Sequence, residues 1–125
     1  MLLCDRTIVE AGTGKVSIIG TFDACSLKSL PGYTVPFTIY VVLIEGLIGH
    51  DYEIAVEFYD LNDNSRVSRN IGSRALWTER LSRISIAMPV APILIGHPGG
   101  YDIVVLADDQ EIDRQRLIVT YTPPA

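Results

Sequence analysis

Residues 4–23, CDRTIVEAGTGKVSIIGTFD, decide the fold, because they form two β-rich segments joined by a glycine-rich turn. Gly12 and Gly14 flank Thr13 between these segments, and glycine readily adopts the positive φ values that tight hairpin loops require. The stretch AGTGK resembles a phosphate loop in composition only, since it lacks the spacing of such a loop and no helix is predicted after it. We therefore predict a β-hairpin here.

Further strands follow from the hydrophobic pattern. Residues 37–44 are apolar except for Thr38 and predict a central strand buried on both faces. Residues 52–59 alternate between apolar and polar, which predicts a strand with one face in the core and an acidic, solvated outer face. Residues 66–71 are expected to form a short edge strand, and residues 72–80 a loop.

A second hairpin is predicted near the C-terminus. Residues 101–117, YDIVVLADDQEIDRQRL, resemble residues 52–67, YEIAVEFYDLNDNSRV, because both run from a tyrosine through a strand into an acidic turn. About eight short strands without helical periodicity predict one domain over residues 1–125. We expect an all-β, immunoglobulin-like antiparallel β-sandwich of about seven to nine strands. In such folds a tyrosine placed like Tyr101 donates its hydroxyl to the backbone of the preceding corner.

Net charge, the length of the apolar runs and the position of the cysteines limit the partners and the cellular compartment that we expect. The net charge of -5 opposes nucleic-acid binding, since the chain would repel a phosphate backbone. No apolar run is long enough for a signal peptide or a bilayer span, so we expect a cytoplasmic protein without membrane contact. Cys25 should lie about three residues, or roughly 10 Å, beyond the hairpin pairing of Cys4, so we expect both thiols to be free.

No motif in the sequence indicates catalysis or a cofactor. DLNDNS (residues 60–65) begins like a calcium loop but has Ser65 and Ile71 where that loop needs glycine and glutamate. His50 and His97 are the only histidines and do not have zinc-ligand spacing with the cysteines. Nucleophile elbows and phosphate loops are absent as well. We expect no metal, no cofactor and no enzymatic activity.

Two features of the sequence point to a binding surface. Trp77 lies in a predicted loop, and the proline-flanked segment VAPILIGH contains Ile93, Leu94 and Ile95. These residues either close the ends of the core or form an exposed apolar patch that binds a partner. Arg80 and Arg83 would border such a patch, because arginine is favoured at interfaces, although arginines also form ordinary surface ion pairs.

The first hairpin resembles the N-terminal signature of a family of small, functionally uncharacterised proteins of bacteria and phages, a domain of unknown function. The family pattern is Cys-Asp, a few apolar residues, then Gly-Lys-x-Ser-x-x-Gly-x-Phe-Asp. The matching residues here are Cys4, Asp5, Gly14, Lys15, Ser17, Gly20, Phe22 and Asp23. The segment GGYDIVVLADDQEI, residues 99–112, fits the closing strands of the family. The resemblance implies a prokaryotic or viral source and no particular activity.

The sequence thus predicts a non-enzymatic module that binds a protein partner or its own copy through an apolar and arginine-bearing face. Two alternatives from other classes stay open. The first is a structural subunit of a phage or contractile assembly. The second is a hydrolase whose catalytic residues are dispersed along the chain.

Overall fold

The computed structural model describes residues 1–123, without the side chain of Ile71, and within them the chain is all β. It forms eleven strands: β1 (Leu2–Val9), β2 (Val16–Thr21), β3 (Ala24–Leu27), β4 (Gly32–Tyr33), β5 (Phe37–Leu43), β6 (Asp51–Asp60), β7 (Ser65–Leu76), β8 (Ile84–Val90), β9 (Leu94–Ile95), β10 (Gly99–Ala107) and β11 (Gln110–Tyr121). The described residues contain no helix that could cross a membrane.

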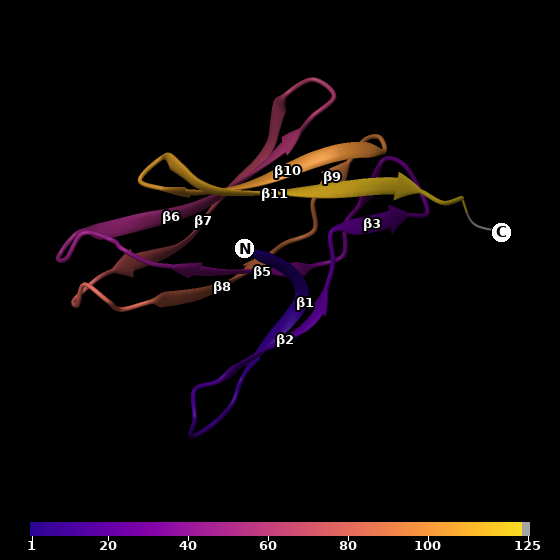
Figure 1. Ribbon diagram of the computed structural model, residues 1–125. Helices are drawn as coiled ribbons and strands as arrows, with labels where there is room; N and C mark the ends of the chain where they lie inside the picture. Colours follow the sequence, from indigo (N-terminus) through magenta and orange to yellow (C-terminus); the bar gives the residue numbers. More distant parts are fainter. Residues whose placement is uncertain (124–125) are drawn as a thin grey trace.

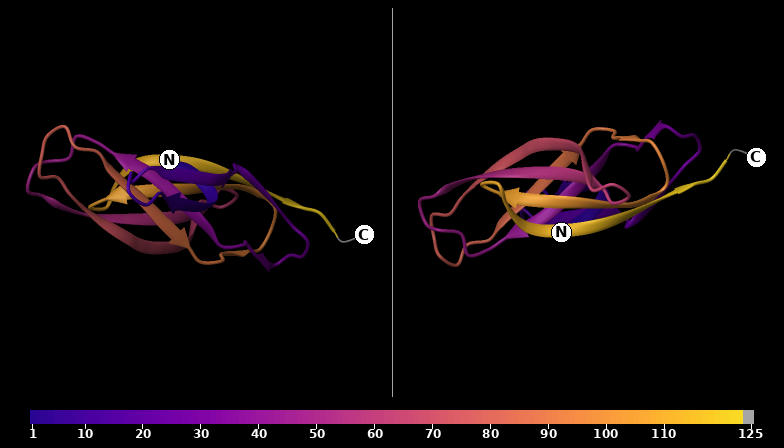
Figure 2. Two further views of the ribbon diagram at one scale, coloured as in Figure 1. Left: turned by 90° about the horizontal axis from the view of Figure 1, so that it is seen from below. Right: turned by 90° about the horizontal axis from the view of Figure 1, so that it is seen from above.

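The strands form two main sheets, which Figure 1 shows as two layers. Sheet A has the order β2-β1-β5-β8, sheet B has the order β3-β11-β10-β6-β7, and β4 pairs only with β9. Both views in Figure 2 show an elongated molecule. Its C-terminus lies at one end, and the β5–β6 and β7–β8 loops lie at the other.

One hydrophobic core lies between the two sheets. Sheet A contributes the inward side chains of β5 and β8, such as Ile39 and Met88, and sheet B contributes those of β6, β10 and β11, such as Phe58, Ile103 and Leu117. Each of these side chains is at most 2% exposed. Burial at about 25 cal/mol per Å² of apolar surface makes this contact between the sheets the main stabilising interaction of the fold.

The predicted N-terminal hairpin is confirmed. β1 and β2 pair antiparallel, and Gly12 and Gly14 have φ values of 89° and 71° in the connecting turn. Cys4 pairs with Thr21, one residue from the expected position opposite Phe22. Both cysteines are free, as predicted.

Several strand predictions need correction. The expected loop over residues 72–80 begins with strand, because β7 continues to Leu76 as the partner of β6. The number of strands exceeds nine because residues 24–36, for which the sequence pattern predicts no strand, contain β3 and β4, and because the short strand β9 lies in the segment before His97. β3 pairs in parallel with β11, so the sheets are not wholly antiparallel.

β5 is central in sheet A but buried on one face only. Phe37, Ile39 and Val41 are buried in the core, whereas Val42, which points to the other face, is 44% exposed. The prediction of burial on both faces was therefore wrong, because no layer formed by residues 1–123 covers the outer face of sheet A. A continuous apolar run does not reveal that one of its faces lacks a partner.

The predicted tyrosine corner is confirmed. The Tyr101 hydroxyl donates a hydrogen bond of 2.6 Å to the carbonyl oxygen of His97, while the ring stacks on Phe58 at a centroid distance of 5.4 Å. The bond fixes the loop that precedes β10, and burial raises the pKa of the Tyr101 hydroxyl.

Tyr101→Phe should lower the free energy of unfolding by about 1 kcal/mol, because it removes one hydrogen bond and keeps the ring in the core. Urea denaturation followed by circular dichroism measures this change. Tyr121→Phe is the matched control, since Tyr121 is 47% exposed near the end of β11. Equal stability of Tyr101→Phe and the wild type would show that the corner bond does not support the fold.

Candidate functional site

Sheet A has an open edge along β5, because the pairing of β1 with β5 reaches no further than Tyr40. The pairs are Leu2 with Tyr40, Leu3 with Ile39 and Cys4 with Thr38. β5 continues beyond Tyr40 and remains paired with β8 on its other side, as far as Leu43 opposite Ile84. Among residues 1–123, no strand pairs with residues 42–44 on the β1 side, and such an edge can accept an additional strand.

A groove of about 350 Å³ lies beside this open edge. Its lining comes from both sheets and from the loops at this end of the molecule: Val41, Val42, Leu43, Ile44, Glu45, Gly46, Tyr52, Ile54, Trp77, Ala107, Ile112 and Asp113. We call this site the open-edge groove. Its lining residues are mostly apolar, and its two acidic side chains are those of Glu45 and Asp113. This lining suits an extended peptide with apolar side chains better than a small anion.

Trp77 is part of the groove wall and is held firmly in place. Its side chain is 4% exposed, and its indole Nε1 donates a hydrogen bond of 3.0 Å to the carbonyl oxygen of Ser82. Its ring meets that of Tyr52 edge to face, with centroids 5.5 Å apart. A Cβ atom at Gly46 would overlap the Trp77 ring, so this position has room for glycine only.

The backbone bends sharply where β5 leaves the sheet. Glu45 has a φ of 61°, in the left-handed region that costs a residue with a Cβ atom about 1 kcal/mol or more. Ile44, Leu47 and Ile48 around this bend are 61%, 69% and 61% exposed. Strained backbone and clustered exposed aliphatic side chains are typical of binding sites rather than of stabilising loops.

Two of the predicted interface arginines lie beside this groove. Arg80, Leu81 and Arg83 line a shallow depression together with Ile44 and Glu45, which also line the groove. Leu81 is 90% exposed. Arg80 and Arg83 therefore lie beside the groove that Trp77 lines, but Trp77 is a buried wall residue and not an exposed anchor.

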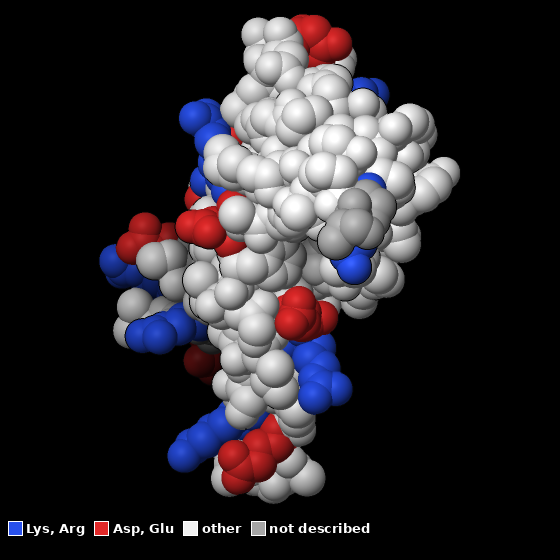
Figure 3. All heavy atoms as spheres, turned by 90° about the vertical axis from the view of Figure 1, so that its right-hand side faces the viewer, with Lys and Arg blue, Asp and Glu red and all other residues white. Residues whose placement is uncertain are grey.

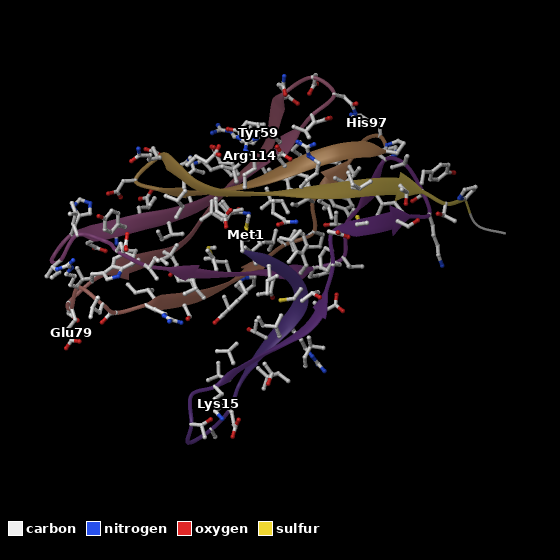
Figure 4. The ribbon with its side chains drawn as sticks, in the orientation of Figure 1. Met1, Lys15, Tyr59, Glu79, His97 and Arg114 are labelled. Carbon is white, nitrogen blue, oxygen red and sulfur yellow. The ribbon has the colours of Figure 1, made fainter. Side chains whose placement is uncertain are left out.

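The other three predicted interface residues lie at the opposite end of the molecule. Ile93 and Ile95 are 7% and 0% exposed and belong to the core, while Leu94 is 49% exposed and pairs with Tyr33. Figure 4 shows the separation through its labels, with Glu79 at one end and His97 at the other. The six predicted residues therefore do not form one surface. Trp77, Ile93 and Ile95 are buried in the core, in line with the interpretation that they close its ends.

The end of the molecule that carries Leu94 also has an exposed apolar surface. Figure 3 looks at this end, where a broad area without charged side chains adjoins a charged flank. Tyr33 and Val35 are 65% and 71% exposed here. This surface has no unpaired central strand, so it is a weaker candidate than the open-edge groove.

The outer face of sheet B is closed by ion pairs. Glu57 is 5% exposed and accepts hydrogen bonds of 2.7 Å from Arg66, 2.9 Å from Arg69 and 2.8 Å from the Tyr59 hydroxyl. The expectation of a solvated acidic face on β6 was therefore wrong, because arginines of the neighbouring β7 cover the carboxylate. Burial by itself would raise the pKa of Glu57, but these hydrogen bonds outweigh burial and lower the pKa to about 2.

Asp102 on β10 repeats this arrangement. It is 2% exposed and binds Arg114 at 2.7 Å and Arg116 at 3.1 Å, and the two arginines lower its pKa against the effect of burial. Figure 4 shows the labelled side chains of Tyr59 and Arg114 on the outer side of sheet B. The arginines of this face therefore form ion pairs within the chain, so few of these arginines are available to bind a partner.

The two histidines each contact a carboxylate. His50 Nε2 lies 2.5 Å from Asp108 Oδ2, and His97 Nε2 lies 2.5 Å from Asp60 Oδ2. Hydrogen bonds to the Pro98 carbonyl and then to Asp60 raise the pKa of His97. Among residues 1–123 neither histidine hydrogen-bonds to a serine or cysteine side chain, and no three metal-binding side chains are grouped. Asp60 and Asp63 instead accept backbone N–H bonds within the DLNDNS turn.

The open-edge groove could not be identified from the sequence, although one signal pointed to it. The apolar run that starts at Phe37 continues past the end of β5 through Ile44, Leu47 and Ile48. Exposed apolar residues in a loop beyond the end of a strand indicate a surface that binds another molecule or segment. Which strand edge they would adjoin depends on pairing across the whole chain.

The comparison with protein families identifies the chain. A family of unknown function (DUF6941) matches residues 1–120, and the chain belongs to this family. No curated protein and no solved structure matches it.

The stability of the protein should fall in acid partly through Glu57. Because the pKa of Glu57 is about 2 in the folded protein and near 4.5 when unfolded, its contribution is complete above about pH 5. It is lost as the pH falls toward 2, and the difference corresponds to about 3 kcal/mol.

Glu57→Gln should therefore reduce the change in the free energy of unfolding between pH 5 and pH 2.5, as measured by urea denaturation at each pH. Glu111→Gln is the control, because the Glu111 side chain is 47% exposed and also bound to an arginine, Arg114. An unchanged pH dependence in Glu57→Gln would contradict the assignment of the low pKa to this buried carboxylate.

Proposed function

We propose that this member of the family is a non-enzymatic protein-interaction module that binds an extended polypeptide segment at the open-edge groove. One observation carries the proposal: the backbone of residues 42–44, at and just beyond the end of β5, is unpaired on the β1 side and lies beside a preformed apolar groove. Main-chain hydrogen bonds to a free strand edge supply affinity, and neighbouring pockets supply specificity for alternate side chains.

The chemistry of the groove defines the kind of segment that fits. Side chains of the bound strand would alternate between the apolar wall around Trp77 and the solvent. Arg80 and Arg83 next to the groove favour acidic residues beyond one end of that segment. We therefore expect a partner sequence of β-branched residues followed by one or two carboxylates.

The remaining sequence predictions belong to the same proposal. We propose an immunoglobulin-like class for the two-layered fold, which the Tyr101 corner supports. We also propose a cytoplasmic role in a bacterial or phage setting, with a structural role in a phage or contractile assembly as the alternative. The exposed surface around Tyr33, Val35 and Leu94 favours that alternative, because subunits of assemblies need more than one contact surface.

Selection of peptides on the immobilised protein tests the groove directly. A library of random ten-residue peptides displayed on phage should yield β-rich sequences that bind the wild type and not Ile44→Glu, because Ile44 is 61% exposed on the groove wall. Val35→Glu, changed at a 71% exposed residue of the opposite end, is the matched control and should bind like the wild type.

Trp77 reports occupancy of the groove, because it is the only tryptophan in the chain. Synthetic versions of the selected peptides should change its fluorescence and lower its quenching by acrylamide. Peptides that bind Ile44→Glu as well as they bind the wild type would refute the groove as the binding site.

A further inference from the structure

The first hairpin continues beyond the body of the molecule as an arm. We define the arm as residues 5–20, the part of β1 and β2 after the last pair between β1 and β5. Figure 1 shows it extending away from both sheets, and Figure 4 shows Lys15 at its tip. Beyond Cys4 the arm is a two-stranded ribbon with both strand edges unpaired.

The arm exposes apolar side chains on both of its faces. Ile8 and Ile19 point to one face and are 47% and 36% exposed, while Val9 points to the other and is 67% exposed. An isolated two-stranded hairpin is marginally stable in water. An arm of this composition is therefore expected to gain order when another surface covers it.

We infer that the arm of a second copy occupies the open-edge groove, so that two copies each insert their arm beside β5 of the other. This inference rests on the proposed function, because it names the occupant of the same groove. The added strand of the arm pairs with residues 42–44 at the end of β5, and its aliphatic side chains cover Ile44 and the groove wall.

A second copy would pair the open edge of β5 and cover the arm at the same time. The open edge of β5 has backbone N–H and C=O groups without partners, and so do both edges of the arm. A foreign segment in the groove would leave the arm uncovered. In a pair of copies each arm meets an edge, and the same two surfaces are used twice, as a two-fold interface requires.

Charge also favours the arm as the contact between copies. The whole chain has a net charge of -5, so most of its surface would repel a second copy. The arm is neutral overall, because Asp5 and Glu10 balance Arg6 and Lys15. Figure 3 shows charges of both signs along the projecting lower part of the molecule. Association through the arm thus brings a neutral segment against the groove.

The size and position of the two surfaces agree with a dimer contact. Residues 5–20 and 41–46 amount to twenty-two residues in each copy, and about 20–30 residues a side are typical of stable interfaces. Both surfaces lie on the β1 side of β5, the arm on one side of the short β1–β5 pairing and the open edge on the other. A single rotation can therefore bring each arm to the partner's edge.

Sedimentation equilibrium between about 1 µM and 1 mM tests the inference. The wild type should form dimers at the upper end of this range. Val9→Glu in the arm and Ile44→Glu at the edge should each lower the association constant by at least tenfold, while Val35→Glu at the opposite end should leave it unchanged. All three residues are at least 61% exposed, and the thermal midpoint of each dilute variant confirms that it folds.

Mixing the two defective variants distinguishes arm exchange from other modes of self-association. In a mixed dimer, one contact combines the altered arm with the altered edge, but the other combines a wild-type arm with a wild-type edge. The mixture should therefore dimerise more strongly than either variant alone. Because both substitutions introduce glutamate, no new ion pair between the variants can cause this recovery.

Three results would overturn the inference: a wild type that is monomeric at 1 mM, dimers that persist in Val9→Glu, or a mixture that does not recover. The peptide selection separates this failure from that of the proposed function. If a selected peptide still binds the wild type through Ile44, the groove binds segments of other proteins and the arm is not its occupant. If neither peptides nor a second copy bind, both conclusions fail.

Discussion

The three-residue pairing between β1 and β5 is the constraint on which the rest of the molecule depends. Because Leu2, Leu3 and Cys4 alone join the two strands, the N-terminal segment must leave sheet A almost as soon as it enters it. Leu3 and Cys4 are fully enclosed at this junction, whereas the residues on either side of it are exposed. Pairing that continued past Cys4 would have absorbed the arm into the sheet, whereas the open edge of β5 lies on the other side of this junction, beyond the pair of Leu2 with Tyr40.

The two outer faces of the sandwich use their polar groups differently. On sheet B the buried carboxylates of Glu57 and Asp102 form ion pairs with arginines of neighbouring strands. A partner that bound this face by breaking these pairs would lose their free energy. On sheet A the outward residues of β5 and β8 are uncharged, among them Tyr40, Val42 and Ala87. Desolvating such a face costs little, so the energetics favour binding on the side of sheet A.

Local signals in the sequence were sufficient for the two hairpins and the tyrosine corner, but not for the short strands or for pairing between distant segments. Gly12 and Gly14 specify the first hairpin, and the residues before Tyr101 specify its corner, because each depends on neighbours within a few positions. The burial of Glu57 depends on Arg66 and Arg69 across a strand pair, and the parallel pairing of β3 with β11 joins residues far apart in the chain. The groove is the extreme case, because it depends on how much of β5 the pairing with β1 covers, which no stretch of sequence encodes alone.

The remaining sheet edges show why this one is unusual. The edge strand β8 contains Pro89, which has no N–H to offer to another strand, and the edge strand β7 carries Arg66, Arg69 and Arg74. β3 is only four residues long. Proline, charge and shortness are the devices by which proteins prevent unwanted strand addition. Residues 42–44 contain neither proline nor a charged residue and are followed by a strained turn and an apolar groove. The edge strand β2 in the arm, VSIIGT, also lacks proline and charge. The two edges without these devices are therefore the two that the proposed contact between copies joins.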